Sequence, residues 1–299
     1  MSIQKRVLQF INDEKLWNVG EKVCVAVSGG VDSMVLLHLL HRTQRAHGGV
    51  LEVCTIDHQF RAESKNECAF VVMEAKRLEL KVYTKSLDIP MGSNLYERAR
   101  QERQKALKSI DCDVIATGHH QEDQAETLLY RLLRGSGLDG LSAMKPVQDG
   151  WCRPLLCSSK QDILAFAQRE GIRWFDDPSN ENSLRGKLRK ILSDLDVIHG
   201  ASVPAVARTA SLLAEDAKLL NEYTSLAWKR CAKEDGLCMN KWMQEPTGMQ
   251  IRLLKHLCIE RHVAIRSQIL VHFQKNPVRV QLPKGFWLVC INGIISIQR

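Results

Sequence analysis

Ser28-Gly29-Gly30-Val31-Asp32-Ser33 lies between the apolar run Val23-Cys24-Val25-Ala26-Val27 and the helix-like pattern Met34–Leu40. A buried strand, two adjacent glycines and an apolar helix are the layout of a phosphate-binding loop, because glycines let backbone N–H groups approach an anion. The helix start adds unpaired N–H donors and the positive end of the helix dipole. Ser28 and Ser33 can add hydroxyl donors. No lysine follows the glycines, which excludes the G-x-x-x-x-G-K-[ST] loop. The alternative is a tight turn with a serine N-cap.

Apolar runs alternate with helix-like patterns from about residue 22 to residue 175. The runs are continuous rather than alternating, which is typical of strands buried on both faces of a sheet. A β-α-β-α series of this kind predicts an α/β fold with a doubly wound parallel sheet. The expected strands are 22–27, 51–57, 81–86, 113–117 and a short one at 153–156, and the expected helices are 32–45, 65–80, 95–109, 121–134 and 160–170.

The later part of the chain is expected to form a second, smaller and mainly helical domain. A basic helix is predicted over 184–195, before the boundary, and helices over 204–231 and 247–274 with a β-hairpin over 278–298 follow it. We therefore expect a catalytic domain at 1–199 and a helical domain at 200–299.

Charge is distributed unevenly between the two parts. Residues 1–184 hold 24 basic and 25 acidic side chains, whereas residues 185–299 hold 18 basic and 9 acidic ones. The asymmetry indicates a nucleic-acid contact surface in the basic part. The alternative is a solvated basic surface.

Composition excludes several classes of protein. The chain of 299 residues is 44% hydrophobic and 25% charged, as in ordinary globular proteins. No apolar run reaches the ~18–20 residues that a membrane helix needs. The ten cysteines contain no C-x-x-C pair, which argues against a zinc ribbon or a disulfide framework. We expect a cytoplasmic protein with reduced cysteines and no membrane partner.

A second polar group lies in the stretch Thr117–Thr127. If 121–134 is helical, His119, Asp123 and Glu126 fall on one face of that helix. This face begins at the carboxyl end of a strand, where doubly wound sheets bind ligands. Such a group could bind Mg²⁺, position an amine or shuttle a proton. The alternative is a capped helix start whose acids complement the dipole.

Several motifs together resemble a known family. Ser28–Ser33 resembles the pyrophosphate loop of the N-type ATP pyrophosphatases, and the remaining motifs resemble those of the tRNA(Ile)-lysidine synthetases. These motifs, which span about 23–195 in the family's order, are Ala116-Thr117-Gly118-His119-His120-x-x-Asp123-Gln124-Ala125-Glu126-Thr127, Arg131-x-x-Arg134-Gly135, Asp57-His58-x-x-Arg61, Asn94-Leu95-x-x-x-Ala99-Arg100, Arg153-Pro154-Leu155-Leu156, Trp174-x-x-Asp177-Pro178 and Arg185-x-Lys187-Leu188-Arg189.

The resemblance implies an adenine nucleotide α hydrolase-like fold and a ligase activity. The family joins lysine to C2 of the wobble cytidine in the CAU anticodon of an isoleucine tRNA. ATP first adenylates the cytidine O2 and releases pyrophosphate, and the lysine ε-amine then displaces AMP. The implied ligands are ATP with Mg²⁺, free L-lysine and the tRNA. The oligomeric state stays open, with a homodimer as one option.

The same resemblance implies roles for individual residues. The nucleotide site comprises Ser28, Gly29, Gly30, Val31, Asp32 and Ser33; the catalytic group comprises Asp32, Arg100, His120, Asp123, Glu126 and Arg189; and the tRNA contacts comprise Asp57, His58, Arg61, Arg185, Lys187, Arg189 and Lys190. Asp32 and Asp123 are the candidate Mg²⁺ ligands. The sequence does not separate a metal ligand from an ammonium ligand among Asp32, Asp123 and Glu126.

The chain departs from the family pattern in three places. Glu122-Asp123 stands where the family has two aspartates, Gln59-Phe60 where it has Gly-Leu, and Arg185-Gly186 where it has Arg-Asn. The end at residue 299 predicts a compact member without a further C-terminal domain. Two alternatives remain: a 2-thiocytidine-type sulfur transferase, which would use paired cysteines for an iron–sulfur cluster, and a non-catalytic tRNA-binding protein.

Overall fold

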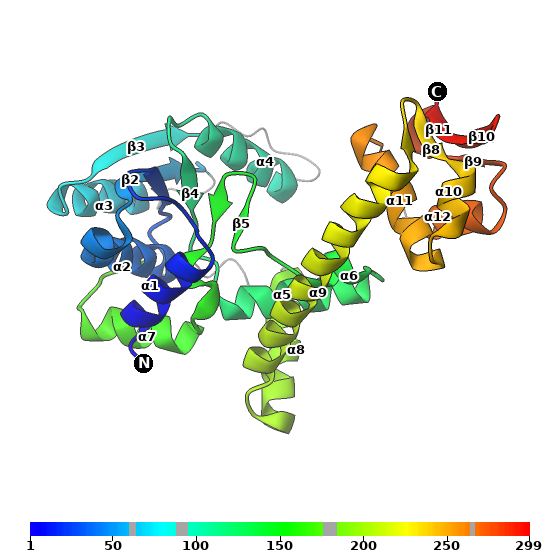
Figure 1. Cartoon of the computed structure of the whole chain (residues 1–299). Helices are drawn as coiled ribbons and strands as arrows, with labels where there is room; N and C mark the ends of the chain where they lie inside the picture. The colour runs from blue at the N-terminus through cyan, green and yellow to red at the C-terminus, as the bar shows by residue number, and fades with distance from the viewer. Residues whose placement is uncertain (60–63, 88–94, 176–183, 264–266) are drawn as a thin grey trace. The chain divides into compact units, whose positions relative to one another are not determined.

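The computed structural model describes residues 1–59, 64–87, 95–175, 184–263 and 267–299. The chain folds into two compact units, Met1–Ala214 and Glu215–Arg299 (Figure 1). This division falls later along the chain than the boundary at 199/200 that the sequence suggests, and the assignment of functional domains stays a prediction.

A six-stranded sheet with the order β3-β2-β1-β4-β6-β5 forms the centre of the first unit. Neighbouring strands are parallel except for β5 and β6, which are antiparallel. The strands are β1 (Lys22–Ala26), β2 (Val50–Asp57), β3 (Lys81–Ser86), β4 (Val114–Ala116), β5 (Val147–Gln148) and β6 (Trp151–Cys152). The predicted doubly wound α/β sheet is confirmed.

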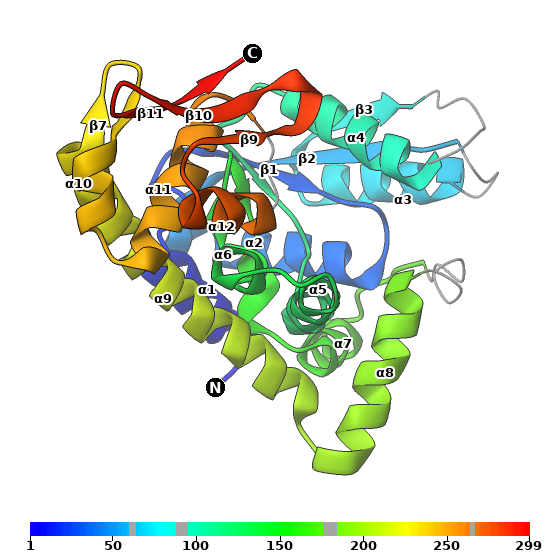
Figure 2. The same cartoon turned by 90° about the vertical axis from the view of Figure 1, so that its right-hand side faces the viewer.

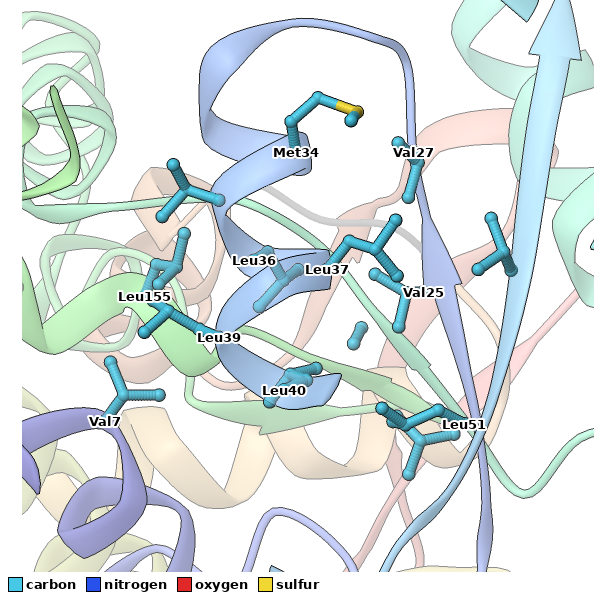
Figure 3. Packing of buried hydrophobic residues seen from close by; sticks show 14 of the residues in the cluster. Val7, Val25, Val27, Met34, Leu36, Leu37, Leu39, Leu40, Leu51 and Leu155 are labelled. Carbon is cyan, nitrogen blue, oxygen red and sulfur yellow. The ribbon is translucent and has the colours of Figure 1, made fainter. Parts of the chain in front are cut away.

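Helices cover both faces of this sheet (Figure 1). The α-helices described within residues 1–199 are α1 (Ile3–Asp13), α2 (Val31–His47), α3 (Ser64–Arg77), α4 (Leu95–Lys108), α5 (Gln121–Leu133), α6 (Leu138–Leu141), α7 (Lys160–Arg169) and α8 (Leu184–His199). Val23 and Val25 of β1 join the main core with α1, α2 and α7, whereas Cys24 joins a smaller core with Leu107 of α4. Figure 3 shows the main core, in which Leu37 of α2 packs near Val25. Burial on both faces explains why the strands read as continuous apolar runs.

The expected strand at 153–156 is wrong. These residues belong to a 3-10 helix, η1 (Pro154–Cys157), and the strand β6 ends just before it. Pro154 stands at the first helical position, where its fixed φ favours a helical turn and its missing N–H costs no hydrogen bond. The apolar pattern is the same for a buried turn and a buried strand, so it could not separate them.

Helix α8 and the first turns of α9 (Ser202–Cys231) pack against α5 in the first unit. Leu192 of α8 and Val203 of α9 bury Ala125 of α5, and Ala210 packs beside Leu128. These contacts explain why the first unit extends into α9.

In its described residues, the second unit contains the end of α9, three further α-helices, a short 3-10 helix, η3 (Pro283–Gly285), and a five-stranded sheet with the order β7-β8-β11-β10-β9 (Figure 2). Its elements are β7 (Ala232–Lys233), β8 (Gly236–Cys238), α10 (Met239–Gln244), α11 (Thr247–Glu260), α12 (Ser267–Lys275), β9 (Arg279–Gln281), β10 (Trp287–Ile291) and β11 (Ile294–Gln298). Trp242 is buried at its core and donates its indole N–H to the carbonyl of Gln250 at 3.0 Å.

Two expectations for this unit are wrong in detail. The single helix expected at 247–274 is two helices, because the chain leaves α11 through His262 with a left-handed φ of 55°. The expected terminal hairpin is part of a larger sheet, since β11 also pairs with β8.

Among the described residues, no single helix has the length and apolar character that a membrane span requires. Only α8 and α9 taken together, bent by 110°, reach that threshold by length and composition.

Candidate active site at the β1 and β4 ends

The glycine loop lies at the switch point of the sheet, where the chain leaves β1 for α2. Parallel neighbours flank β1 on both sides, β2 on one and β4 on the other, and such a point is where open α/β sheets bind ligands. Gly29 has a φ of 87°, which a side chain would strain, and Gly30 is the N-cap of α2. The first N–H groups of α2 therefore point out of the helix start without helical partners.

The two loop serines have different roles. The Ser33 hydroxyl donates to the carbonyl of Gly30 at 2.9 Å and accepts from the backbone N–H of Ser28 at 3.1 Å. Ser33 thus closes the loop on itself. The Ser28 hydroxyl lies 3.3 Å from that of Ser33 and is the one with more freedom to meet a ligand.

Gly118 leaves room for the glycine loop. It follows β4, and a Cβ at this position would lie 3.0 Å from the carbonyl carbon of Asp32 and 3.1 Å from the nitrogen of Ser33. Both atoms belong to the backbone, which cannot swing aside. The absence of a side chain at 118 therefore sets how closely the β4 end approaches the start of α2.

We expect Gly118→Ala to lower the stability of the first unit by about 1–3 kcal/mol, because the added methyl group must push apart two backbone segments. The nucleotide affinity of this variant should fall as well, because the same methyl group displaces the glycine loop. Thermal unfolding and nucleotide titration measure the two effects. Gly137→Ala is the matched control, since its Cβ would meet nothing within 4 Å and its φ is −77°. Equal melting temperatures for the two variants would contradict this account.

His120 connects the glycine loop to the start of α5. The ring Nδ1 lies 2.8 Å from a Glu122 oxygen, and Nε2 lies 3.7 Å from Asp32 and 3.5 Å from Asp123. The backbone N–H of His120 donates to Asp123 at 3.0 Å, which caps the helix. Three carboxylates thus surround one buried imidazole.

These contacts fix the charges of the group. Burial disfavours the imidazolium, but the hydrogen bonds that its ring N–H groups donate to Asp32 and Glu122 outweigh burial and raise the pKa of His120 to about 10. Burial also opposes ionisation of Asp32, yet His120 and Lys160 lower the pKa of Asp32 below its ordinary value. His120 is therefore a cation and Asp32 an anion at neutral pH.

This arrangement predicts a pH dependence of stability. Because the pKa of His120 rises on folding from its usual 6.5 to about 10, its stabilisation is complete below about pH 6.5 and is lost as the pH rises through 10. At ~1.4 kcal/mol per pKa unit, the unfolding free energy of the wild type relative to His120→Gln should therefore shrink by about 4 kcal/mol between pH 6 and pH 10. Denaturant unfolding at several pH values tests this. Glu122→Gln should move the loss of this stabilisation to lower pH. A difference in unfolding free energy between wild type and His120→Gln that does not change with pH would contradict the raised pKa of His120.

Lys160 is a site residue that the sequence reasoning missed. Its ammonium lies 2.6 Å from Asp32, and its backbone N–H donates to both oxygens of Glu122 at 2.9 Å. Lys160 is the first residue of α7. A cation is unfavourable at a helix N-terminus, so a lysine in that position was a signal that could have pointed to a nearby anion.

Glu126 and Arg189 form a second ion pair beside this group. The Nε of Arg189 lies 2.5 Å from Glu126 Oε1, which joins α8 to α5. Burial raises the pKa of Glu126 although Arg189 opposes the shift. Its other oxygen, Oε2, is buried and has no hydrogen-bond partner within the described ranges. One carboxylate oxygen is thus left for a further donor.

His119 does not share a helical face with Asp123 and Glu126, because α5 begins only at Gln121. The ring Nδ1 of His119 instead lies 2.8 Å from the Thr117 hydroxyl. Burial lowers the pKa of His119 to about 4, so this imidazole is neutral beside the cationic His120.

Other residues predicted for the site lie apart from His120 and its carboxylates, or fall outside the residues that the structure describes. The Asp57 carboxylate accepts from the backbone N–H of Gln59 at 2.9 Å and from the hydroxyl of Ser64, the first residue of α3. Gln59 has a φ of 56°, which explains why glycine suits this position. His58 follows Asp57 and is half-buried. Arg61 lies outside the described residues.

The remaining predicted residues lie on two helices. Arg100 is exposed on α4, and its electrostatic neighbours are other arginines. Arg185, Lys187 and Lys190 are exposed on α8, near Arg189. In the part of the chain that the structure describes, no group of three or more His, Cys, Asp or Glu side chains could hold a metal ion.

Sequence comparison relates the chain to known proteins. The PP-loop domain family matches residues 1–195. A tRNA(Ile)-lysidine synthase of Azoarcus sp. (strain BH72) is 37% identical over 295 residues, covering 93% of this chain and 66% of the relative. Relatives of the same name from Symbiobacterium thermophilum and Pseudomonas aeruginosa are 38% and 33% identical, covering 85% and 82% of this chain and 58% and 57% of the relative. The chain spans between about half and two thirds of the length of such relatives.

Among solved structures, the chain is similar to the U34-tRNA thiolase NcsA from Methanococcus maripaludis with its [4Fe-4S] cluster. The TM-score is 0.58 at 19% identity, covering 71% of this chain and 78% of that one. At this identity the likeness supports the fold alone.

Proposed function

The chain belongs to the PP-loop domain family of ATP-binding proteins, and we propose that it forms lysidine in a tRNA. In this reaction the wobble cytidine O2 attacks the α-phosphorus of ATP, and the bond to pyrophosphate breaks. The lysine ε-amine then attacks C2, the C2–O bond breaks, AMP leaves and the amine loses a proton. The identity to tRNA(Ile)-lysidine synthases over most of the chain supports this activity.

The glycine loop would bind the phosphates of ATP. Three features support this: the left-handed Gly29, the unpaired N–H groups at the start of α2, and the close approach that Gly118 permits. Lys160 and the cationic His120 would add positive charge where pyrophosphate leaves. Mg²⁺ is often held by one or two carboxylates together with substrate phosphates, and Asp32 and Asp123 would supply them.

Glu126 would bind the ammonium group of lysine. The observation that carries this assignment is its buried oxygen Oε2, which the pair with Arg189 leaves without a partner within the described ranges. An ammonium ion is a strong donor to such an oxygen. Asp123, at the first turn of the same helix, would help to orient the amine.

The RNA substrate would be an isoleucine tRNA with a CAU anticodon. The basic face of α8, with Arg185, Lys187 and Lys190, would contact its phosphates. The proposed place of this activity is the cytoplasm.

The test is ATP-dependent incorporation of radiolabelled lysine into that tRNA. Stoichiometric incorporation with release of one AMP and one pyrophosphate is expected, and a transcript with guanosine at the wobble position should accept nothing. Incorporation of sulfur in place of lysine, or binding of tRNA without any ATP consumption, would overturn the proposal in favour of a sulfur transferase or a non-catalytic binder.

A further inference from the structure

Five arginines of the first unit gather beside the candidate site although they are far apart in sequence. They are Arg100 and Arg103 of α4, Arg131 of α5, Arg153 after β6 and Arg185 of α8, and together they are called the arginine cluster below. Arg103 interacts electrostatically with Arg100 and Arg185, and Arg153 interacts with Arg100 and Arg131. The cluster is thus one continuous group of like charges.

Topology places this group at the ligand-binding edge of the sheet. Arg153 follows β6 directly, and β6 runs parallel to β4, whose end leads to His119. His119 in turn interacts electrostatically with Arg153, Arg185 and Arg103. Because the carboxyl ends of parallel strands share one edge, the arginine cluster and the glycine loop lie on the same side of the sheet.

Two of the arginines are fixed in place by neutral groups. Arg131 donates to the carbonyls of Gly140 and Ala143 at 2.8 Å, and Arg153 donates to the carbonyl of Lys145 at 2.7 Å. Both guanidinium groups are therefore held by one segment, 140–145, which leaves their charge uncompensated. The buried Nε of Arg153 has no hydrogen-bond partner within the described ranges.

Other arginines of the chain differ from the cluster, because carboxylates compensate their charge. Six others make ion pairs with carboxylates, namely Arg6, Arg42, Arg77, Arg169, Arg189 and Arg230. Across the residues that the structure covers, no cluster member does. Burial and repulsion from Arg100 and Arg131 lower the pKa of Arg153, and repulsion from Arg100 and Arg185 acts in the same direction on the exposed Arg103. Such repulsion is relieved when an anion binds between the charges.

We propose that the arginine cluster binds the phosphate backbone of the RNA substrate next to its reacting nucleotide. Guanidinium groups match phosphate oxygens in planar, two-pronged geometry. Three members, Arg100, Arg103 and Arg185, are exposed and so are open to a large ligand. Spread over three helices and a loop, the five charges fit a chain of phosphates, whereas the phosphates of ATP already have the glycine loop. This inference rests on the proposed function, and it moves part of the RNA surface into the half of the chain whose net charge is near zero.

Arg103 gives the cleanest test, because it has not been assigned to the nucleotide or lysine site. Binding of isoleucine tRNA to the full chain is measured by filter binding at several salt concentrations, without ATP or lysine. Arg103→Gln should weaken the affinity on the order of tenfold and flatten the slope of log K against log[salt] by about 0.7–0.9. Arg103→Lys should restore most of the slope, and ATP affinity measured by calorimetry should stay within about twofold for both variants.

Arg45→Gln is the matched control. It removes an exposed arginine from the last turn of α2, whose first turn carries the glycine loop, and at ~1.5 Å per residue the two ends are more than 20 Å apart. An Arg103→Gln variant that binds tRNA like Arg45→Gln would overturn the inference. So would a loss of ATP affinity equal to the loss of tRNA affinity, which would make the cluster a nucleotide site. Since binding is measured without catalysis, a failure of lysine incorporation would count against the proposed function alone.

Discussion

Asp32→Asn is expected to reduce pyrophosphate release by about 10²-fold or more while tRNA binding stays nearly unchanged. Asp32 lies at the first turn of the helix that follows the glycine loop, paired with Lys160 at 2.6 Å and close to His120. The asparagine keeps the shape but removes the charge that orients these two cations. Groups that stabilise charge in the transition state typically contribute two to three orders of magnitude to the rate. Pyrophosphate release and filter binding, measured on the same preparation, separate the two effects.

The control for this variant is Asp111→Asn. Asp111 also forms an ion pair at 2.6 Å, with Lys22, but it precedes β4 and so lies at the amino edge of the sheet, away from the site. Lys160→Met provides a second variant, because it removes the partner and leaves Asp32 in place. Normal pyrophosphate release from Asp32→Asn would exclude the carboxylate from the first step. Loss of both activities together with a lowered melting temperature would show a purely structural role.

The sequence predicts the sheet well because its signal is local. Continuous apolar runs mark strands that helices bury on both faces, and the glycine loop marks the switch point at β1. Prediction from the sequence fails where one local pattern fits two different structures. Pro154-Leu155-Leu156 is apolar in either state, so its pattern could not show that these residues begin the 3-10 helix η1. In the same way, the apolar period continues across 247–274 although His262 breaks the helix.

The site is less predictable because its charges meet across long separations. Lys160 reaches Asp32 over 128 positions in the chain, and no local motif connects them. Net charge misleads for the same reason. Residues 1–184 are close to neutral, yet the fold collects arginines from two helices and one loop of this part at a single edge, where Arg185 of α8 joins them. What the sequence does give is the type of residue at each strand end, and the topology then brings those ends together.

The other large effect is expected for Glu126→Gln, which should strongly weaken lysine incorporation at ordinary lysine concentrations while pyrophosphate release continues. The glutamine fills the same buried space but cannot offer a charged oxygen to an ammonium ion. Removing one partner of a buried charge pair typically costs about 2–5 kcal/mol, so the KM for lysine should rise at least thirtyfold. Steady-state kinetics with lysine varied, alongside pyrophosphate release at fixed tRNA and ATP, measure both steps.

Glu170→Gln is the matched control for Glu126→Gln. Glu170 pairs with Arg42 at 2.5 Å at the end of α7 opposite to Lys160, and its side chain is 17% exposed, against 3% for Glu126. Its variant should leave both steps unchanged. Because Glu126 also holds Arg189, a variant Arg189→Lys is needed as well; it retains a cation beside the carboxylate and should affect lysine KM less than Glu126→Gln does. Equal loss of pyrophosphate release and lysine incorporation in Glu126→Gln would instead assign the carboxylate to the nucleotide or its metal, because only a group that acts after adenylation can separate the two steps.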